Sequence, residues 1–137
     1  MKMRILILGD GNSVHTIKWV TALSNKGIHI GLFSLADINH NRFKDLDNFQ
    51  FNSLDLDHGI FRTGEGSLKK IAYLKALPQL RAFIKVYQPD ILHAHYASSY
   101  GFLGQLSHFH PFIVSVWGSD IYDFPRKNLL FKSMIKS

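Results

Sequence analysis

The sequence contains no cysteine, and this absence excludes disulfide bonds, thiolate metal sites and cysteine nucleophiles. It also has no apolar run near the roughly 18 to 20 residues that a membrane-spanning helix requires. Its opening apolar stretch is too short for a signal peptide. We therefore expect a cytoplasmic protein. Neither clustered basic residues with interleaved aromatics nor a recognisable nucleic-acid module is present, so we expect no nucleic-acid partner.

Acidic residues are fewer than basic residues. The chain has 10 Asp and Glu against 16 Lys and Arg, which gives a formal net charge of +6. This balance favours contact with phosphate-bearing molecules or with an anionic membrane surface, without choosing between them. The rest of the composition, 46% apolar and 19% charged residues, is that of an ordinary globular protein. We expect residues 1–137 to form a single domain.

Short apolar segments alternate along the chain with segments at helical spacing. The apolar segments predict strands at 4–8, 28–34, 49–56, 91–95 and 112–117. The helical spacing predicts a first helix that is capped by Asn12 or Ser13 and ends at Lys26 and Gly27, followed by helices at 67–87, 98–108 and 128–135. Pro78 predicts a kink or two abutting helices within 67–87, and 58–66 is interpreted as a loop over a cleft. This alternation predicts an α/β fold, a Rossmann-like parallel sheet flanked by helices.

Parallel sheets of this class bind their ligands outside the carboxyl ends of the strands. Three segments that are distant in sequence follow strands in this pattern, namely 9–15, 93–100 and 117–120. We expect them to converge on one edge of the sheet, and this convergence is the central functional hypothesis.

The first of these segments resembles a dinucleotide-binding turn, but position 14 is valine where the fingerprint needs its third glycine. Gly9 and Gly11 still suggest a turn with positive φ, whose amides suit a phosphate or a sugar hydroxyl. A tight turn with no ligand is the alternative. His15 is placed to donate a hydrogen bond near a bound acceptor, or lies simply on the surface, and Trp19 forms either a platform for a sugar ring or part of the core.

His93 and His95 are two positions apart on a strand and should point to the same side. They resemble one edge of a zinc site, but no third ligand is evident, so we predict a polar cluster and no metal site. Ser98 and Ser99 precede a predicted helix, where they either meet an anionic oxygen or only cap the helix. Asp120 accepts hydrogen bonds from acceptor hydroxyls or acts as a base, or it only caps the next turn.

Three pieces of the chain, in this order, resemble a known family: the glycine-containing first turn, Asp90-Ile91-Leu92-His93-Ala94-His95, and Val114-Ser115-Val116-Trp117-Gly118-Ser119-Asp120. They resemble the amino-terminal domain of retaining GT-B glycosyltransferases of family 4, over nearly the whole chain. One departure is Trp117, since many members of the family carry histidine at that position.

The resemblance implies an enzyme of two Rossmann-like domains that transfers a sugar from a nucleotide-sugar donor to a hydroxyl acceptor, glycan or lipid-linked, with retention. This chain would be the acceptor side, inactive alone, and the donor-binding domain is expected to be missing from it. Asp120 and His95 are the predicted catalytic residues. The predicted substrate-binding residues are Gly9, Gly11, Asn12, Ser13, His15, Tyr96, Ser98, Ser99, Trp117, Gly118 and Ser119.

The same resemblance implies no cofactor and no required metal, with the nucleotide sugar as co-substrate. The implied setting is the synthesis of cell-envelope polysaccharides. The expected partners are the donor domain, the acceptor and an anionic membrane surface, with peripheral association at the inner face of the cell membrane. The basic residues of 67–87 support that membrane contact, or form only a solvated face. The alternative function is a stand-alone nucleotide or small-ligand binding module with a doubly wound fold.

Overall fold

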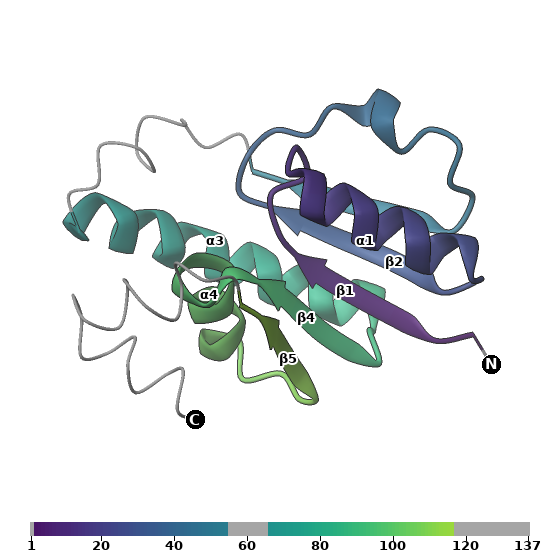
Figure 1. The fold of residues 1–137 in the computed structure, drawn as a ribbon. Helices are drawn as coiled ribbons and strands as arrows, with labels where there is room; N and C mark the ends of the chain where they lie inside the picture. The colour runs from purple at the N-terminus through teal and green to yellow at the C-terminus, as the bar shows by residue number, and fades with distance from the viewer. Residues whose placement is uncertain (1, 55–65, 117–137) are drawn as a thin grey trace.

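Five parallel strands form one sheet, which the computed structural model describes within residues 2–54 and 66–116. The strands are β1 (Arg4–Leu8), β2 (His29–Ser34), β3 (Phe49–Ser53), β4 (Ile91–His95) and β5 (Phe112–Ser115). Their order is β3-β2-β1-β4-β5, and every neighbouring pair is parallel. The predicted Rossmann-like α/β fold is confirmed (Figure 1).

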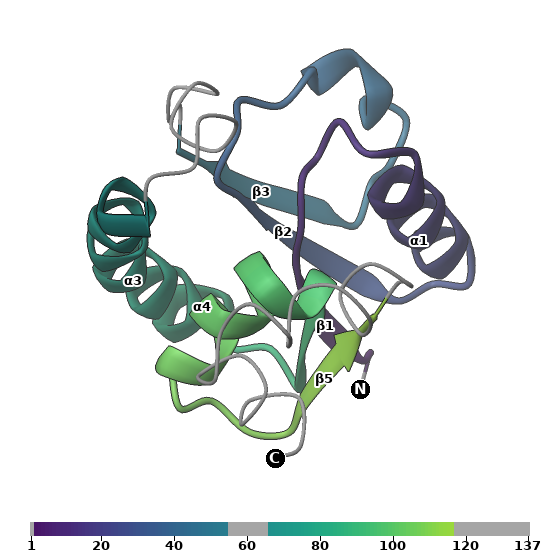
Figure 2. The same cartoon turned by 60° about the vertical axis from the view of Figure 1, so that its left-hand side comes forward.

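Helices cover both faces of the sheet. They are α1 (Val14–Asn25), α3 (Gly66–Tyr87) and α4 (Gly101–Leu106), with a 3-10 turn η1 (His40–Arg42) and a π-helical turn η2 (Tyr96–Tyr100). Figure 2 shows α1 on one face and both α3 and α4 on the other. No helix in the described ranges combines the length and the apolar character needed to cross a membrane.

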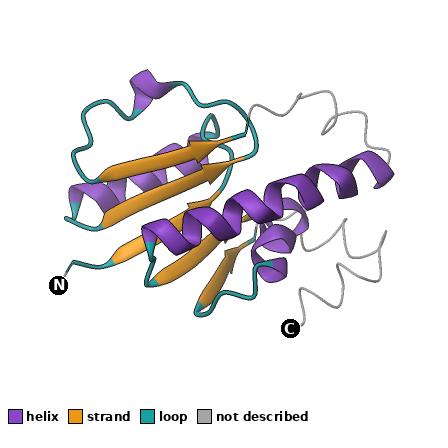
Figure 3. Cartoon of the chain, turned by 180° about the vertical axis from the view of Figure 1, so that it is seen from behind, coloured by secondary structure: helices purple, strands orange, loops and turns teal. Residues whose placement is uncertain are grey.

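The central strand β1 is buried on both faces because alternate side chains enter different cores. Leu6 and Leu8 pack with Leu80, Leu92 and Leu103 on the side of α3 and α4. On the side of α1, a second core contains Ile5, Ile7, Val20, Ile30 and Leu32. This burial on both faces explains the continuous apolar run of β1. Figure 3 shows that the carboxyl ends of all five strands lie at the same edge of the sheet.

The first helix ends where the sequence predicts. Gly27 has a φ of 85°, its N–H donates to the Ser24 carbonyl, and the N–H of Ile28 donates to the Leu23 carbonyl. These bonds form a Schellman motif, which places glycine at the one left-handed position. At the other end Ser13 is the N-cap residue, but its hydroxyl makes no capping hydrogen bond. The expected side-chain cap is therefore wrong.

The long helix α3 continues through Pro78, so the expected division into two abutting helices is wrong. Proline removes the hydrogen bond to the carbonyl four residues earlier. Buried residues on both sides of it, Tyr73 and Ala76 before and Leu80 and Tyr87 after, hold the two halves of α3 against the same core. Packing on the sheet thus outweighs the missing backbone bond.

Element boundaries differ from prediction at the carboxyl edge. β3 ends at Ser53 and β5 at Ser115, each shorter than expected. The helical segment after β4 begins at Tyr96, two residues early, as the π turn η2. The predicted helix 128–135, and the predicted loop up to residue 65, lie outside the described residues.

Candidate functional site

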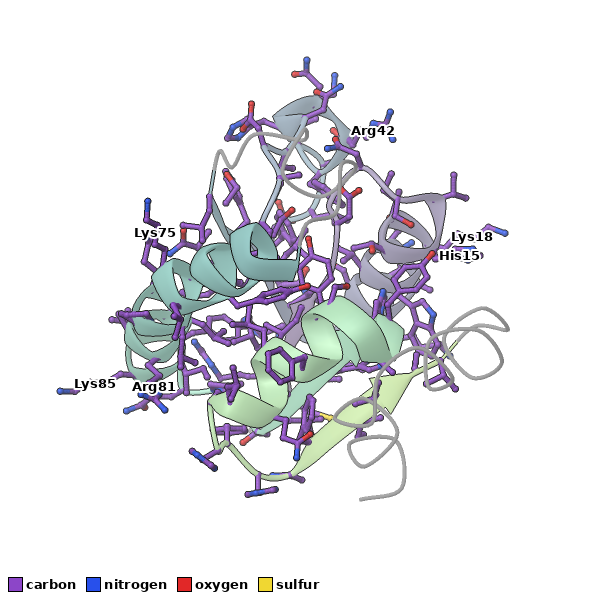
Figure 4. The ribbon with its side chains drawn as sticks, turned by 90° about the vertical axis from the view of Figure 1, so that its left-hand side faces the viewer. His15, Lys18, Arg42, Lys75, Arg81 and Lys85 are labelled. Carbon is purple, nitrogen blue, oxygen red and sulfur yellow. The ribbon has the colours of Figure 1, made fainter. Side chains whose placement is uncertain are left out.

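The carboxyl ends of β1 and β4 form the candidate site. The strand order of the sheet reverses between these two neighbouring strands. From β1 the chain proceeds outward through β2 to β3, and then returns to the other side of β1 as β4. Such a switch point separates the connecting segments and leaves a crevice at the strand ends. Figure 4 looks onto this edge.

Asp10 organises the turn that follows β1. Its Oδ1 accepts a hydrogen bond from the Asn12 N–H at 2.9 Å, and its carbonyl accepts one from the Ser13 N–H at 3.0 Å. The Gly11 N–H donates to the Ser34 hydroxyl at 3.2 Å. The backbone donors of Gly11, Asn12 and Ser13 are thus engaged inside the protein.

Asn12 joins the turn to the segment after β2. Its Nδ2 donates to the Asp37 carbonyl at 2.7 Å, and its Oδ1 accepts from the Asn39 N–H at 3.4 Å. Arg42, from η1, donates to the Asn12 carbonyl at 3.5 Å. The side-chain amide predicted to bind substrate therefore also holds the turn after β1 against the segment after β2.

Gly9 and Gly11 are required for close packing. Among the described glycines only Gly27 has positive φ, so the expectation of positive φ in this turn is wrong. A Cβ on Gly9 would lie 2.9 Å from Thr16 Oγ1, and one on Gly11 would lie 2.7 Å from Ile38 Cγ1. Small residues here let β1 run directly under α1 and the segment after β2.

His93 and His95 point to the same side of the sheet, as predicted. Their ring centroids are 4.9 Å apart. His93 Nε2 lies 2.7 Å from the Ser115 hydroxyl, and His95 Nδ1 lies 3.3 Å from the Thr16 hydroxyl. Burial lowers the pKa of His93 and, aided by the nearby His93 and His15, lowers the pKa of His95 to about 4.

Trp19 is partly packed and partly exposed, so it matches neither predicted alternative, a sugar platform or a core residue, completely. Its ring contacts His93 at a centroid distance of 5.2 Å and His95 at 6.1 Å, both edge to face. It nevertheless remains 41% exposed, so it covers the histidines with one part and meets solvent with the other. His15, one turn earlier on α1, is exposed.

The zinc alternative requires a third ligand beside the two histidines. Within residues 2–54 and 66–116, no three His, Asp or Glu side chains are grouped as a metal ion would require. The Ser115 hydroxyl lies within hydrogen-bond distance of His93, and the Thr16 hydroxyl lies within hydrogen-bond distance of His95. The pair is a polar cluster between the sheet and α1.

The segment after β4 differs from the expected capped helix. His95 is the N-cap residue of η2, so Ser98 and Ser99 lie inside the turn instead of before it, and the alternative that they cap the helix does not hold. Tyr96 has a φ of 72°, a left-handed conformation that is uncommon outside glycine. This backbone turn directs the chain from the end of β4 into η2.

Tyr100 is a site residue that the sequence interpretation missed. Its hydroxyl accepts a hydrogen bond from the Leu35 N–H at 3.2 Å and thereby connects η2 with the segment after β2. Burial raises its pKa, while hydrogen bonds to Leu35 and Ser34 oppose that shift. A tyrosine following a strand at the predicted edge was the available signal.

The third predicted segment is outside the described residues. Trp117, Gly118, Ser119 and Asp120 follow Val116, the last described position. The first two segments do converge, since a Cβ on Gly9 would lie 3.4 Å from His95 Nδ1. The place of Asp120 beside them stays a prediction.

A sequence profile described as glycosyl transferase 4-like matches residues 4–137. The chain belongs to the glycosyl transferase 4-like family. The match includes both the turn after β1 and the end of β4 that form the candidate site. No curated protein matches the chain.

Two solved structures support the fold of this glycosyl transferase 4-like domain. Both are of the carboxyl-terminal domain of the PF1911 hydrogenase from Pyrococcus furiosus. One has a TM-score of 0.56 at 9% identity and covers 84% of this chain and 94% of that one. The other has a TM-score of 0.55 at 10% identity and covers 85% and 92%. At such low identity the similarity concerns the architecture alone.

Proposed function

We propose that this chain is the amino-terminal, acceptor-side domain of a retaining GT-B glycosyltransferase. The parent enzyme transfers a sugar from a nucleotide-sugar donor to a hydroxyl acceptor, glycan or lipid-linked. The observation that carries the proposal is the convergence of the turn after β1 and the end of β4 at the switch point of a glycosyl transferase 4-like domain. Binding at such a switch point is the general behaviour of open parallel sheets.

In this proposal the edge described above forms one wall of the reaction groove. The donor phosphates bind to a second domain, without a metal or other cofactor, and the groove holds the acceptor hydroxyl near the anomeric carbon. Positioning and electrostatic stabilisation of the departing phosphate then supply most of the rate. Asp120 and His95 remain the predicted catalytic residues, and Tyr96, Ser98 and Ser99 remain among the predicted substrate-binding residues.

Exposed basic side chains near this edge of the sheet favour an anionic ligand. His15 and Lys18 project from the first turns of α1, and Arg42 projects from η1 (Figure 4). Because Arg42 also donates to the Asn12 carbonyl, its guanidinium stays near the turn after β1. A phosphate on the donor or on a lipid-linked acceptor would meet these groups as it approached the edge.

We further propose that α3 makes peripheral contact with an anionic membrane surface, at the inner face of the cell membrane. The parent enzyme would then take part in cell-envelope polysaccharide synthesis. Lys75 and Lys85 are exposed on α3, beside Leu74 and Val86, which are 65% and 80% exposed. The sequence of α3 contains no acidic residue. Basic and apolar side chains together suit the boundary between lipid headgroups and acyl chains.

An activity assay tests the enzymatic proposal. The chain alone, incubated with radiolabelled UDP-glucose or GDP-mannose and alkyl glycoside acceptors, is expected to show no transfer because the donor pocket belongs to the second domain. Turnover by the chain alone would contradict this. Tight binding of UDP or GDP would instead favour the stand-alone nucleotide-binding module.

Amide chemical-shift mapping locates the acceptor wall. Alkyl glycosides below their micelle concentration are expected to shift the amides of 9–13 and 96–99. The amides of 45–48 and of His29, which line a shallow depression elsewhere on the domain, serve as the internal control. Shifts confined to those control amides would place the acceptor elsewhere.

Liposome sedimentation tests the membrane contact. Binding to phosphatidylglycerol vesicles at low salt is expected to fall at high salt, because surface charges are screened. The double variant Lys75→Glu/Lys85→Glu should abolish binding. Lys18→Glu/Lys44→Glu, which makes the same charge change away from α3, should retain it. Equal loss in both pairs would show that net charge, and not α3, is responsible.

A further inference from the structure

Four aromatic side chains join η1 to the edge strand β3 in one continuous series of ring contacts. Phe43 stacks on Phe49 with ring centroids 4.7 Å apart, and Phe49 stacks on Phe51 at 6.1 Å. The ring of His40 meets the Phe51 ring edge to face at 4.6 Å. We call these four side chains the aromatic platform. Because His40 begins η1 and Phe43 caps it, the series starts and ends on the same short turn.

The aromatic platform is buried at one end and exposed at the other. Phe43 is 4% exposed and belongs to the core on the side of α1, against which Phe49 packs. Phe51 is 37% exposed, and His40 is exposed as well. The strand partner of Phe51 is Leu32, a residue of the same core, so the Phe51 ring faces the side of α1. Rings held in this way have lost their conformational freedom before a ligand arrives, which lowers the entropic cost of binding.

Side-chain amides lie next to the exposed end of the platform. Asn39 and Asn41 flank His40 in the sequence and are exposed, and Asn39 Oδ1 accepts a hydrogen bond from the Asn41 N–H at 3.2 Å. A side-chain amide can donate to one hydroxyl and accept from another. A sugar ring presents C–H groups on its faces and hydroxyls on its rim, so it matches an aromatic face that is bordered by amides. Because both amides are neutral, they favour a neutral sugar over a nucleotide.

The platform is continuous with the candidate site. The Asn39 N–H donates to Asn12 Oδ1 at 3.4 Å, and the Arg42 guanidinium donates to the Asn12 carbonyl at 3.5 Å. His40 lies between Asn39 and Arg42 in the sequence, so these two contacts keep it beside the turn after β1. A chain-like ligand that extends from the crevice over η1 would therefore meet the exposed rings of the platform.

We propose that the aromatic platform is a carbohydrate subsite, on which a pyranose ring of a glycan acceptor stacks against Phe51 and forms hydrogen bonds with Asn39 and Asn41. The subsite takes a sugar unit that is remote from the reacting hydroxyl, so it favours acceptors of several sugar units over monosaccharides. The assignment to the acceptor rests on the transferase function proposed above. Binding of a sugar ring by the platform does not depend on that function.

The test follows the aromatic carbon-13 signals of Phe51 and His40 in the 137-residue chain. Cellotriose and maltotriose are titrated separately, and sorbitol is the control because it carries hydroxyls on a flexible chain without a ring. At least one trisaccharide should move both signals, and sorbitol should move neither. Unmoved signals with both trisaccharides, or equal movement with sorbitol, would overturn the proposal. Signals that move with protein concentration alone would identify a second copy of the chain as the occupant and would also overturn it.

Variants of Phe51 separate a stacking face from a merely apolar surface. Phe51→Tyr keeps the ring and should leave the Kd for the trisaccharide unchanged. Phe51→Leu keeps an apolar side chain without the ring and should raise that Kd about two- to tenfold, as expected for one aromatic contact. Ile113→Ala, which removes an exposed apolar side chain from the opposite edge strand β5, should not change it.

An unchanged Kd in Phe51→Leu would refute the subsite. If that variant fails to fold, the signal movements in the unaltered chain and the Kd of Phe51→Tyr decide.

The amides of 9–13 and 96–99, recorded in the same titrations, separate this proposal from the proposed function. Movement of the platform signals without movement of those amides would support the carbohydrate subsite and would place the acceptor wall elsewhere. Movement of those amides with unmoved platform signals would reject the subsite and leave the acceptor wall in place.

Discussion

The hydroxyl of Tyr100 accepts a hydrogen bond from the backbone N–H of Leu35 at 3.2 Å, across the end of β1. It therefore joins the segment after β4 to the segment after β2, on the two sides of the candidate crevice. Tyr100→Phe leaves the Leu35 N–H buried without this acceptor, which typically costs about 1 to 3 kcal/mol. Urea unfolding of the two chains should show this loss as a lower midpoint at an unchanged slope.

Tyr87 is the matched control for that variant. It is also buried, but its hydroxyl has no hydrogen-bond partner among the residues that the structure describes, and burial raises its pKa to about 12. Tyr87→Phe removes a polar group that had lost its hydration, so stability should stay the same or rise by up to about 1 kcal/mol. Equal destabilisation by Tyr87→Phe and Tyr100→Phe would show that the Leu35 bond is not the cause.

Arg4 should be the most sensitive position at the amino edge of the sheet. Its Nε and Nη2 donate to the Tyr87 carbonyl at 2.9 and 2.5 Å, and its guanidinium carbon lies 4.4 Å from the centroid of the Tyr87 ring. Lysine can reproduce neither the two-point bond nor the stacking. Arg4→Lys should therefore cost about 1 to 2 kcal/mol in urea unfolding.

Asp90→Asn serves as the comparison for Arg4→Lys. Asp90 Oδ2 accepts from the Arg4 backbone N–H at 2.8 Å, and an asparagine oxygen can accept the same bond. The variant should cost less than Arg4→Lys. A larger loss of stability for Asp90→Asn would mean that the charge of Asp90 contributes more than the two hydrogen bonds from the Arg4 guanidinium to the Tyr87 carbonyl.

The sequence was sufficient to predict the parallel sheet, because alternating apolar and helical segments leave few other arrangements. It also predicted that His93 and His95 share a side, since side chains of a strand alternate. Those predictions rest on local periodicity. The bond between Tyr100 and Leu35 joins residues 65 positions apart and appears in no periodic pattern.

The turn after β1 shows the same limit. The glycines at 9 and 11 suggested a special backbone conformation, whereas both are needed because Thr16 and Ile38 lie against them. Close packing of this kind depends on how elements are placed relative to one another, which a single sequence does not encode locally. Tyr96 lies between the predicted strand 91–95 and the predicted helix 98–108, and its positive φ could not be inferred from its residue type.

The side chain of Asn12 should stabilise the backbone conformation of the segment after β2. Asn12→Asp replaces the Nδ2 donor by an oxygen opposite the Asp37 carbonyl, so the 2.7 Å bond becomes a repulsion. Hydrogen exchange of the Ile38 and Asn39 amides should accelerate about tenfold, the equivalent of a bond worth about 1.4 kcal/mol. Asn25→Asp, at an exposed position at the end of α1, should leave those amides unchanged. Equal acceleration in both variants would indicate a general loss of stability.

The ring of Phe112 leaves no room for a side chain at Gly104. A Cβ at this position would lie 2.5 Å from Phe112 Cε2 and 3.2 Å from Leu8 Cδ1. Alanine gains about 1 kcal/mol of helix propensity, but a contact this close forces the ring to move within a packed interface, which costs about 1 to 3 kcal/mol. We expect Gly104→Ala to be destabilising by about 1 kcal/mol in urea unfolding.

A double-mutant cycle identifies the source of that cost. Phe112→Leu removes the outer ring atoms, so Gly104→Ala should cost less in that background, with a coupling energy of about 0.5 to 2 kcal/mol. Gly27→Ala is the control: no atom lies within 4 Å of its Cβ, and its penalty arises from the positive φ alone. Phe112→Leu should leave the Gly27→Ala penalty unchanged, because a smaller side chain at position 112 cannot relieve backbone strain at Gly27. Equal coupling at Gly27 and Gly104 would mean that the Phe112→Leu background weakens the whole domain instead of opening space at α4.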